Sequence, residues 1–370
     1  MKIGIITFHF GDNYGAVLQT AATFQYLVKQ GHEPVVLNYL PFTGRQEPLL
    51  KNWRVKGDLR AGVIRKFGRF LTCRKSSSRF EAFREAAFSR TEECRSLAAL
   101  TSITRDLDAV VTGSDQVWHF DRSSAYFLAW ESGDNLRRIA YAPCCATDDQ
   151  DYSKAEELKG YLSRFQAISV RDAASRRAIG RVTGEEPLVV CDPTLLVSLE
   201  DLESSAGEDE EYLLTYILGT PDPQILRDSI AELRKKTGVY KVKAIVGPAL
   251  QNWRSPREAD DVLWGPRPAD WLGLIKNCKV LLTDSFHGCL FAMKYDVPFV
   301  GFYKEALRAP RLVDLNERYS LGDQICDEAD LVEVCCGGCS TLSGESRMKV
   351  IKHIEQSEDY LKGALAPNLK

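Results

Sequence analysis

The chain contains 370 residues, of which 44% are hydrophobic and 27% are charged, and its formal net charge is −3. This composition indicates a globular protein large enough for two domains, and the small negative charge argues against nucleic-acid binding. The N-terminal apolar run at residues 2–7 is too short for a signal peptide or a membrane span, so we expect a cytoplasmic protein.

The eleven cysteines give no strong sign of a metal site. Cys191, Cys278 and Cys289 fall inside predicted strands or helices, where a thiol behaves as a small apolar residue. The run at residues 335–339 has Cys-x-x-Cys spacing, but no second pair lies at zinc-site spacing and His353 is the only imidazole nearby. We therefore expect no bound metal.

The chain opens with a predicted strand, helix and strand at residues 3–8, 15–30 and 34–39. The Gly-x-Gly-x-x-Gly turn of a dinucleotide site is missing, and Asn38 stands where such a site needs an acid. We therefore expect no NAD or FAD cofactor.

Three polar residues follow the first predicted strand, namely His9, Asp12 and Asn13. They stand at the carboxyl end of a strand, which makes them candidates for binding a polar ligand. The alternative is that Asn13 only forms a turn and caps the helix.

Residues 41–105 interrupt the α/β pattern with a basic helical insertion. Between residues 51 and 79 there are ten Lys or Arg and one acid, Asp58, interleaved with apolar residues. Such a pattern is typical of a solvated face over a core-facing stripe. The alternative is peripheral contact with anionic lipid at the inner face of the membrane.

The next predicted strand, at residues 107–112, leads into Asp115, Gln116 and Trp118. Polar groups beside an aromatic ring suit a sugar, whose hydroxyls take hydrogen bonds while its apolar side lies on the ring. Arg171 begins the loop after a later strand at residues 166–170, although a local pair with an aspartate is a common alternative.

Residues 198–211 are acidic and nearly free of apolar side chains, which predicts a linker. A second α/β series follows over residues 212–344, and a last helix lies within residues 345–370, where we expect it to pack back on the first domain. The sequence therefore predicts an α/β protein with two Rossmann-like doubly wound domains, 1–197 and 212–344, facing a central cleft.

The second half contains the most informative loop, between a buried strand at residues 280–282 and a helix from about residue 288. Ser285 and His287 lie there, at a helix N-terminus that attracts anions. The alternative is a capping role for Ser285 and a carbonyl partner for His287. Arg308 and Arg311 follow the next strand, and no sequence signature of a phosphate loop, a zinc protease or a carboxylate-rich magnesium site is present.

Five motif blocks of this chain resemble the polysaccharide pyruvyl transferase family. They occur in order over roughly the first 320 residues, at 7–19, 111–118, 168–172, 191–194 and 283–288. The resemblance implies a fold similar to the two-domain glycosyltransferase B class. It also implies phosphoenolpyruvate as co-substrate, with pyruvate transferred as a ketal onto two hydroxyls of a sugar in a cell-surface polysaccharide or its lipid-linked precursor.

By position within the motifs, the resemblance assigns His287 and Arg171 to phosphoenolpyruvate. One branch of the family has an arginine two residues before this histidine, where the present chain has Ser285. Another cation must then meet the charge of the donor, and we expect Arg311, with Arg308 or Lys304 as alternatives.

The family chemistry gives each candidate residue a role. Our hypothesis is that His287 acts as general acid or stabilises the leaving phosphate, while Asp115 or Asp12 accepts the proton of the attacking hydroxyl. We expect the first domain to form the acceptor side and the second domain the donor side. The donor contacts are then Arg171, at the end of the first domain, with Ser285, Gly288 and Arg311 of the second, and the acceptor contacts are His9, Asp12, Asn13, Gln116 and Trp118.

Two other classes of protein stay open from the sequence. A nucleotide-sugar glycosyltransferase shares the fold but uses a diphosphate donor. A non-catalytic polysaccharide-assembly protein keeps the fold without a donor site, and Ser285 is the residue that leaves this alternative open.

Overall fold

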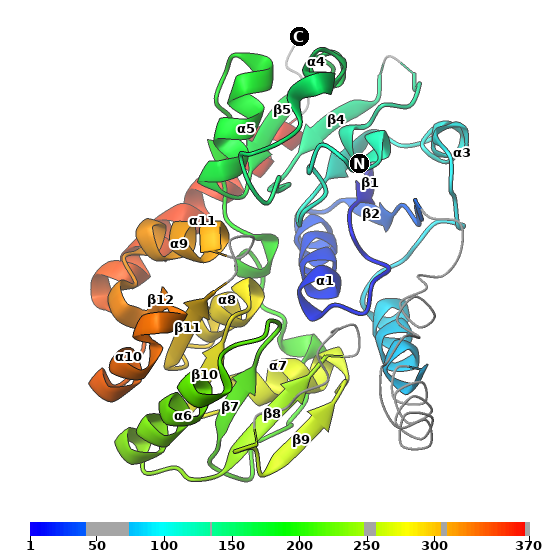
Figure 1. Ribbon diagram of the computed structural model, residues 1–370. Helices are drawn as coiled ribbons and strands as arrows, with labels where there is room; N and C mark the ends of the chain where they lie inside the picture. The colour runs from blue at the N-terminus through cyan, green and yellow to red at the C-terminus, as the bar shows by residue number, and fades with distance from the viewer. Residues whose placement is uncertain (42–73, 134, 248–256, 305–308, 367–370) are drawn as a thin grey trace, which may run out of the picture.

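The computed structural model describes residues 1–41, 74–133, 135–247, 257–304 and 309–366. It contains two six-stranded parallel sheets, one from each half of the chain, and helices pack against both (Figure 1). The predicted fold class is therefore confirmed.

The first sheet has the order β2-β1-β3-β4-β5-β6. Its central strands are buried, as expected for a parallel sheet covered on both faces. The elements of this half are β1 (Lys2–Ile6), α1 (Tyr14–Lys29), β2 (Glu33–Val36), α3 (Leu97–Ile103), β3 (Ala109–Thr112), β4 (Arg137–Ala140), α4 (Ala155–Leu162), β5 (Ala167–Val170), α5 (Ala173–Thr183) and β6 (Leu188–Val189).

The second sheet has the order β12-β11-β10-β7-β8-β9. The sequence pattern did not predict the edge strands β9 and β12, which are short and lack a fully buried apolar run. The elements of this half are β7 (Leu213–Tyr216), α6 (Pro223–Thr237), β8 (Val242–Val246), β9 (Asp261–Trp264), α7 (Pro268–Lys276), β10 (Val280–Thr283), α8 (Phe286–Lys294), β11 (Phe299–Tyr303), α9 (Ala309–Tyr319), β12 (Ile325–Asp327), α10 (Leu331–Gly337) and α11 (Gly344–Leu365).

The order of the strands indicates where a sheet of this kind is expected to bind a ligand. The chain reverses direction across the sheet between β1 and β3 in the first domain and between β7 and β10 in the second. Ligands of doubly wound folds bind outside the carboxyl ends of the strands at such switch points. The loops after β1, β3, β7 and β10 are therefore the expected ligand-binding loops of the two sheets.

The two domains meet directly at the start of α1. The ring of Tyr14 stacks on Trp271 of α7, with centroids 5.3 Å apart and an angle of 9° between the planes. Its hydroxyl also donates to the carbonyl of Pro266 at 2.9 Å. Because both rings are buried, this contact fixes the N-terminus of α1 against the second domain.

The last helix, α11, runs from the second domain to the back of the first sheet (Figure 1). The hydroxyl of Tyr360 donates to the carbonyl of Ala140 in β4 at 2.9 Å. Ser357 accepts a hydrogen bond from the Cys191 amide at 2.8 Å, next to the end of β6. The C-terminal helix thus contacts the first domain close to the loop that holds Asp192.

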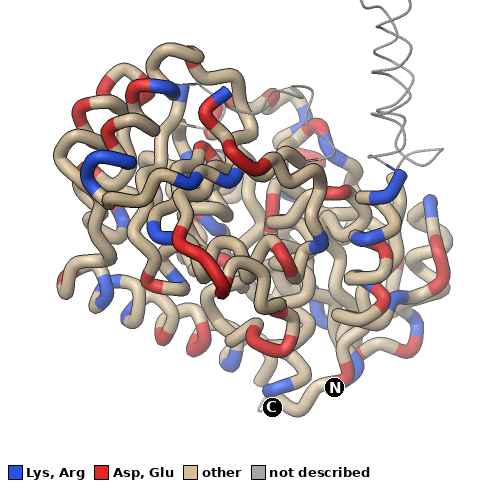
Figure 2. Tube along the Cα trace, turned by 90° about the horizontal axis from the view of Figure 1, so that it is seen from below, with Lys and Arg blue, Asp and Glu red and all other residues tan. Residues whose placement is uncertain are grey.

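Charged residues are interspersed along the trace in both domains (Figure 2). Most of the predicted basic segment, residues 51–73, lies outside the described residues. Within the described part, Arg79 belongs to a helix at residues 74–87, and its guanidinium donates to the carbonyl of Gly265 at 2.6 Å. That cation therefore takes part in a contact between the domains.

Candidate active site

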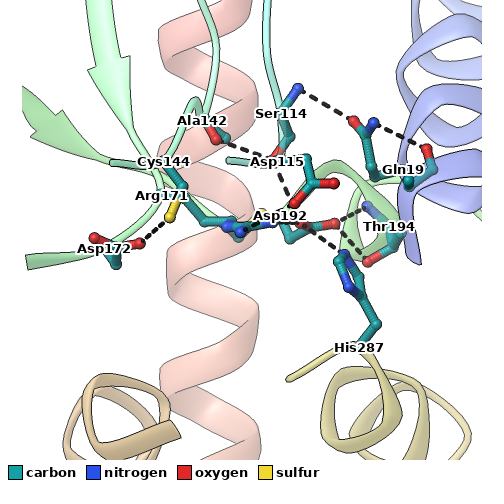
Figure 3. Close-up of polar contacts among 12 residues, drawn as sticks. Gln19, Ser114, Asp115, Ala142, Cys144, Arg171, Asp172, Asp192, Thr194 and His287 are labelled. Atoms are coloured by element: carbon teal, nitrogen blue, oxygen red, sulfur yellow. Dashed lines mark hydrogen bonds and ion pairs between the residues drawn. The ribbon is translucent and has the colours of Figure 1, made fainter. Parts of the chain in front are cut away.

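A buried carboxylate, Asp192, lies at the centre of the candidate site (Figure 3). Arg171 donates to its Oδ2 from Nη1 at 2.9 Å. Thr194 donates to its Oδ1 from both the amide, at 3.1 Å, and the hydroxyl, at 2.8 Å. Nε2 of His287 stands 3.5 Å from Oδ2. Residues of the two domains therefore share one carboxylate.

The charge of Asp192 is stabilised by these neighbours. Burial alone would raise the pKa of the carboxyl, but His287 and Arg171 outweigh that effect and hold the pKa well below its ordinary value of 3.8. Asp192 is thus ionised at neutral pH and orients Arg171 and His287 beside it.

His287 is the second residue of α8 and is 8% exposed. Its helix is capped by Ser285, whose hydroxyl accepts a hydrogen bond from the Gly288 amide at 3.2 Å. Nε2 has no hydrogen-bond partner among the described residues. A buried polar atom without a partner is unusual, and it is available to a ligand or to Asp192 after a small movement.

The other side of the imidazole lies against α1 of the first domain. A Cβ atom on Gly15 would fall 2.0 Å from Nδ1 of His287. Only glycine therefore permits this approach, which places the histidine of one domain at the helix N-terminus of the other.

Arg171 is 2% exposed and follows β5 directly. Its Nε and Nη2 atoms have no hydrogen-bond partner among the described residues, and Nη2 is 3.7 Å from Oδ1 of Asp115. The guanidinium lies 4.7 Å from the ring centroid of Phe286 in the other domain. The local pair with Asp172 is thus not what holds Arg171; Asp192 holds it, and two donors are free for an anion.

Asp115 is held in an unusual backbone conformation in the loop after β3, with a φ of 67°. The loop is anchored by Gln19 of α1, whose side chain accepts from the Ser114 amide at 3.1 Å. At Gly113, with a φ of 107°, an added Cβ would lie 2.2 Å from the carbonyl oxygen of Tyr141. A strained, tightly anchored loop of this kind is a frequent feature of functional sites.

Arg311 of α9 reaches the same loop from the second domain. When the side-chain oxygen of Gln116 faces Arg311, it accepts hydrogen bonds from Nη1 at 2.7 Å and from Nη2 at 3.2 Å of that guanidinium. Lys304 instead pairs with Glu328 at 2.9 Å. Arg308 lies outside the described residues, so Arg311 is the described candidate that reaches the first domain beside Asp115.

Two predicted acceptor residues are in the core, so the structure contradicts those predictions. Trp118 is fully buried, donates to the carbonyl of Tyr126 at 2.9 Å and stacks on Phe127. His9 is fully buried too, and its ring nitrogens contact the Thr7 carbonyl and the Asn38 side chain. Both side chains point to the interior because packing and internal hydrogen bonds, rather than a ligand, satisfy them.

The other two residues of the first loop lie at the surface. Asn13 is exposed and its side chain accepts from the Ala16 amide at 3.1 Å, so it caps α1. Asp12 is half-buried and pairs with Arg84 at 3.2 Å. The capping alternative is thus realised for Asn13, while Asp12 is held by the helix at residues 74–87.

Asp192 has no predicted role, although it belongs to the motif block at residues 191–194. The signal available was its position: Asp192 stands three residues after the end of β6 and directly before Pro193. Cys144 was also missed. Burial raises the pKa of its thiol to about 12, and Sγ donates to Asp172 at 2.9 Å. It is a protonated thiol and supports the turn that carries Arg171.

The described residues include no helix long and apolar enough to cross a membrane. In the same part of the chain, no group of three or more His, Cys, Asp or Glu side chains is placed to hold a metal ion.

The two Rossmann-like domains have the fold of the B-type glycosyltransferases and of epimerases with the same architecture. A glycotransferase of kitacinnamycin aligns with a TM-score of 0.51 and 12% identity, over 99% of each chain. The UDP-GlcNAc 2-epimerase of Methanocaldococcus jannaschii aligns with a TM-score of 0.50 and 11% identity, over 96% of this chain and all of that one. At such identities the likeness concerns the fold alone.

The sequence model of the polysaccharide pyruvyl transferase family matches residues 13–304. The chain therefore belongs to the polysaccharide pyruvyl transferase family, a family of transferases, as its motif blocks suggested. A search among curated proteins gave no match.

Proposed function

We propose that this protein transfers pyruvate from phosphoenolpyruvate to two hydroxyls of one sugar, forming a ketal on a cell-surface polysaccharide or its lipid-linked precursor. Membership of the family supports the reaction class. The observation that carries the proposal is the pairing of Arg171 and His287, two buried groups with unpartnered nitrogens on opposite domains, around one ionised aspartate.

The charges of the donor match this arrangement. Phosphoenolpyruvate carries a carboxylate and a phosphate, and a guanidinium binds either group through two parallel hydrogen bonds. Arg171 offers Nε and Nη2, which lie on one edge of its guanidinium. Arg311 stands nearby on α9 and supplies a second cation. We assign both to the donor, together with the first turn of α8, where Ser285 and Gly288 lie.

The reaction requires one proton to be added to the donor and two to be removed from the acceptor. Protonation of the methylene carbon creates an oxocarbenium-like centre at C2, which a sugar hydroxyl attacks. The C2–O bond to phosphate then breaks, and the second hydroxyl closes the ketal. One acceptor proton is thus balanced by the new methyl group, and the other leaves with phosphate.

His287 is the proposed general acid, or the group that stabilises the departing phosphate, and Asp115 is the proposed general base. Asp115 lies in the loop after β3, 3.7 Å from Arg171, and its side chain is 14% exposed, so it is within reach of both the donor site and the solvent side. Asp12 is the less favoured base because it already pairs with Arg84.

A thermal-shift experiment tests the donor. Wild-type protein and the variants His287→Ala and His32→Ala are heated with phosphoenolpyruvate, with UDP-sugars and with CMP-sugars. His32 is the matched control because it lies beyond the far end of α1. A ligand at a hundred times its dissociation constant adds about 2.7 kcal/mol of stability. We expect phosphoenolpyruvate alone to stabilise the wild type and the control, and His287→Ala to respond less.

A response only to nucleotide sugars would instead assign the protein to the glycosyltransferases. No response to any of these donors would favour the non-catalytic assembly protein. The peripheral membrane contact proposed for residues 51–79 has a separate test, which is flotation with anionic vesicles at low salt. Protein that stays at the bottom of the gradient would contradict that contact.

A further inference from the structure

Helix α9 presents one polar face to the first domain. Arg311, Asp314 and Arg318 are spaced by three, four and seven residues, which places them on the same side of a helix. The adjoining face, formed by Leu312, Leu315 and Tyr319, is buried in the protein core. Helix α9 therefore packs in the second domain through its apolar side chains and contacts the first domain through its charged side chains.

Asp314 and Arg318 fasten the turn that carries Arg171. Nη1 of Arg318 donates to the main-chain carbonyl of Arg171 at 2.9 Å. Oδ1 of Asp314 accepts from the amide of Ala173 at 3.0 Å. The two side chains also form an ion pair with each other, and they are only 15% and 19% exposed. We call this set of contacts the α9 clamp.

The α9 clamp supplies a hydrogen-bond acceptor for the amide of Ala173. Ala173 is the first residue of α5, so its amide has no partner inside the helix. Asp172 caps the same helix from within the first domain, where it accepts from the Ser175 amide at 2.7 Å. Both domains thus hold the turn from which the side chain of Arg171 extends.

We propose that Asp314 and Arg318 are positioning residues for the anionic donor, because they set the main chain of Arg171 from the opposite domain. This inference rests on the proposed function. The side chain of Arg171 extends from the first domain, but helix α9 of the second domain fixes its position relative to His287. A misplacement of about 1 Å at such a group is enough to impair binding and catalysis strongly.

The experiment compares wild-type protein with Arg318→Met, Arg318→Lys and Asp314→Asn. The control is Arg177→Met, which breaks the solvent-exposed pair of Arg177 with Asp148 on the outer side of α5. Phosphoenolpyruvate affinity is measured by calorimetry, and hydrogen exchange of the Ala173 amide reports the clamp without any ligand.

We expect faster exchange at Ala173 and a dissociation constant about tenfold higher in Arg318→Met and Asp314→Asn, since each loses a charge-assisted hydrogen bond. Arg318→Lys keeps one donor and should recover part of the affinity. The control should match the wild type in both measurements. Unchanged affinity in all three clamp variants of a protein that binds phosphoenolpyruvate would overturn the inference alone.

Two further outcomes have distinct meanings. Wild-type protein whose Ala173 amide exchanges as fast as in the variants would show that the clamp is absent in solution, which also overturns the inference. Wild-type protein that protects this amide but ignores phosphoenolpyruvate would overturn the proposed function, and the donor role of the clamp with it.

Discussion

Substitution of Gly15 by alanine is the sharpest test of how the two domains meet at His287. The added Cβ would lie 2.0 Å from Nδ1 and 2.5 Å from both Cγ and Cε1 of the imidazole. Non-bonded atoms do not approach so closely, and the ring is 8% exposed, so it has little free space around it. The imidazole must turn or the helices must separate.

The change in stability should be small because two effects oppose each other. Alanine in place of glycine favours a helix by about 1 kcal/mol. Overpacking of a well-filled site costs about 1 to 3 kcal/mol. The free energy of unfolding should therefore fall by no more than about 2 kcal/mol. The loss of phosphoenolpyruvate binding should be much larger, because a displaced imidazole moves Nε2 of His287 from its place 3.5 Å from Oδ2 of Asp192.

The assay is thermal denaturation of Gly15→Ala with and without phosphoenolpyruvate. The matched control is Gly160→Ala, because Gly160 lies in α4 and an added Cβ there meets nothing within 4 Å. We expect the control to gain up to about 1 kcal/mol and to keep its response to the ligand. A Gly15→Ala protein that is stabilised and still binds phosphoenolpyruvate normally would refute the placement of His287 against α1.

Three further predictions concern buried side chains. Burial lowers the pKa of His353 to about 4 from an ordinary 6.5, so between these values the unfolded chain takes up a proton that the folded chain does not. The free energy of unfolding, measured in urea, should therefore fall by about 2 kcal/mol between pH 7 and pH 5. This fall should be absent in His353→Gln. Asp192→Asn should lower the free energy of unfolding by about 3 to 5 kcal/mol at pH 7. The difference from wild type should shrink as the pH falls below 3.8, because the contacts that lower the pKa stabilise only the ionised carboxylate. A difference in denaturation midpoints that stays constant with pH would contradict this. Trp118→Phe should lose about 1 to 3 kcal/mol of stability without changing acceptor affinity, since the indole packs in the core; a raised acceptor KM at unchanged stability would restore its predicted role at the sugar.

Much of the fold could be predicted from the sequence because its signals are local. Buried parallel strands give short apolar runs, and helices give periodic ones with caps such as Asp222 before α6. The edge strand β9 escaped prediction because it is only partly buried and its pattern is weak. The family was also evident from short motifs, each of which is contiguous in the chain.

The position of a residue at a strand end predicted which loops form the site, but not which side chains point into it. His287 and Arg171 were found by that argument, and the structure brings both to the buried carboxylate of Asp192. Trp118 and His9 meet the same criterion and are buried in the core. The direction of a side chain depends on the packing around it, which strand ends alone do not specify.

The sequence by itself determined two doubly wound domains, their strand-end loops and the family to which the chain belongs. The tertiary structure alone decided the contacts between distant segments: His287 against Gly15, both near Asp192, and Arg318 on the carbonyl of Arg171, 147 residues away. The physical reason is that local propensity and periodicity act over a few residues, whereas these contacts exist only once two separately formed sheets have docked.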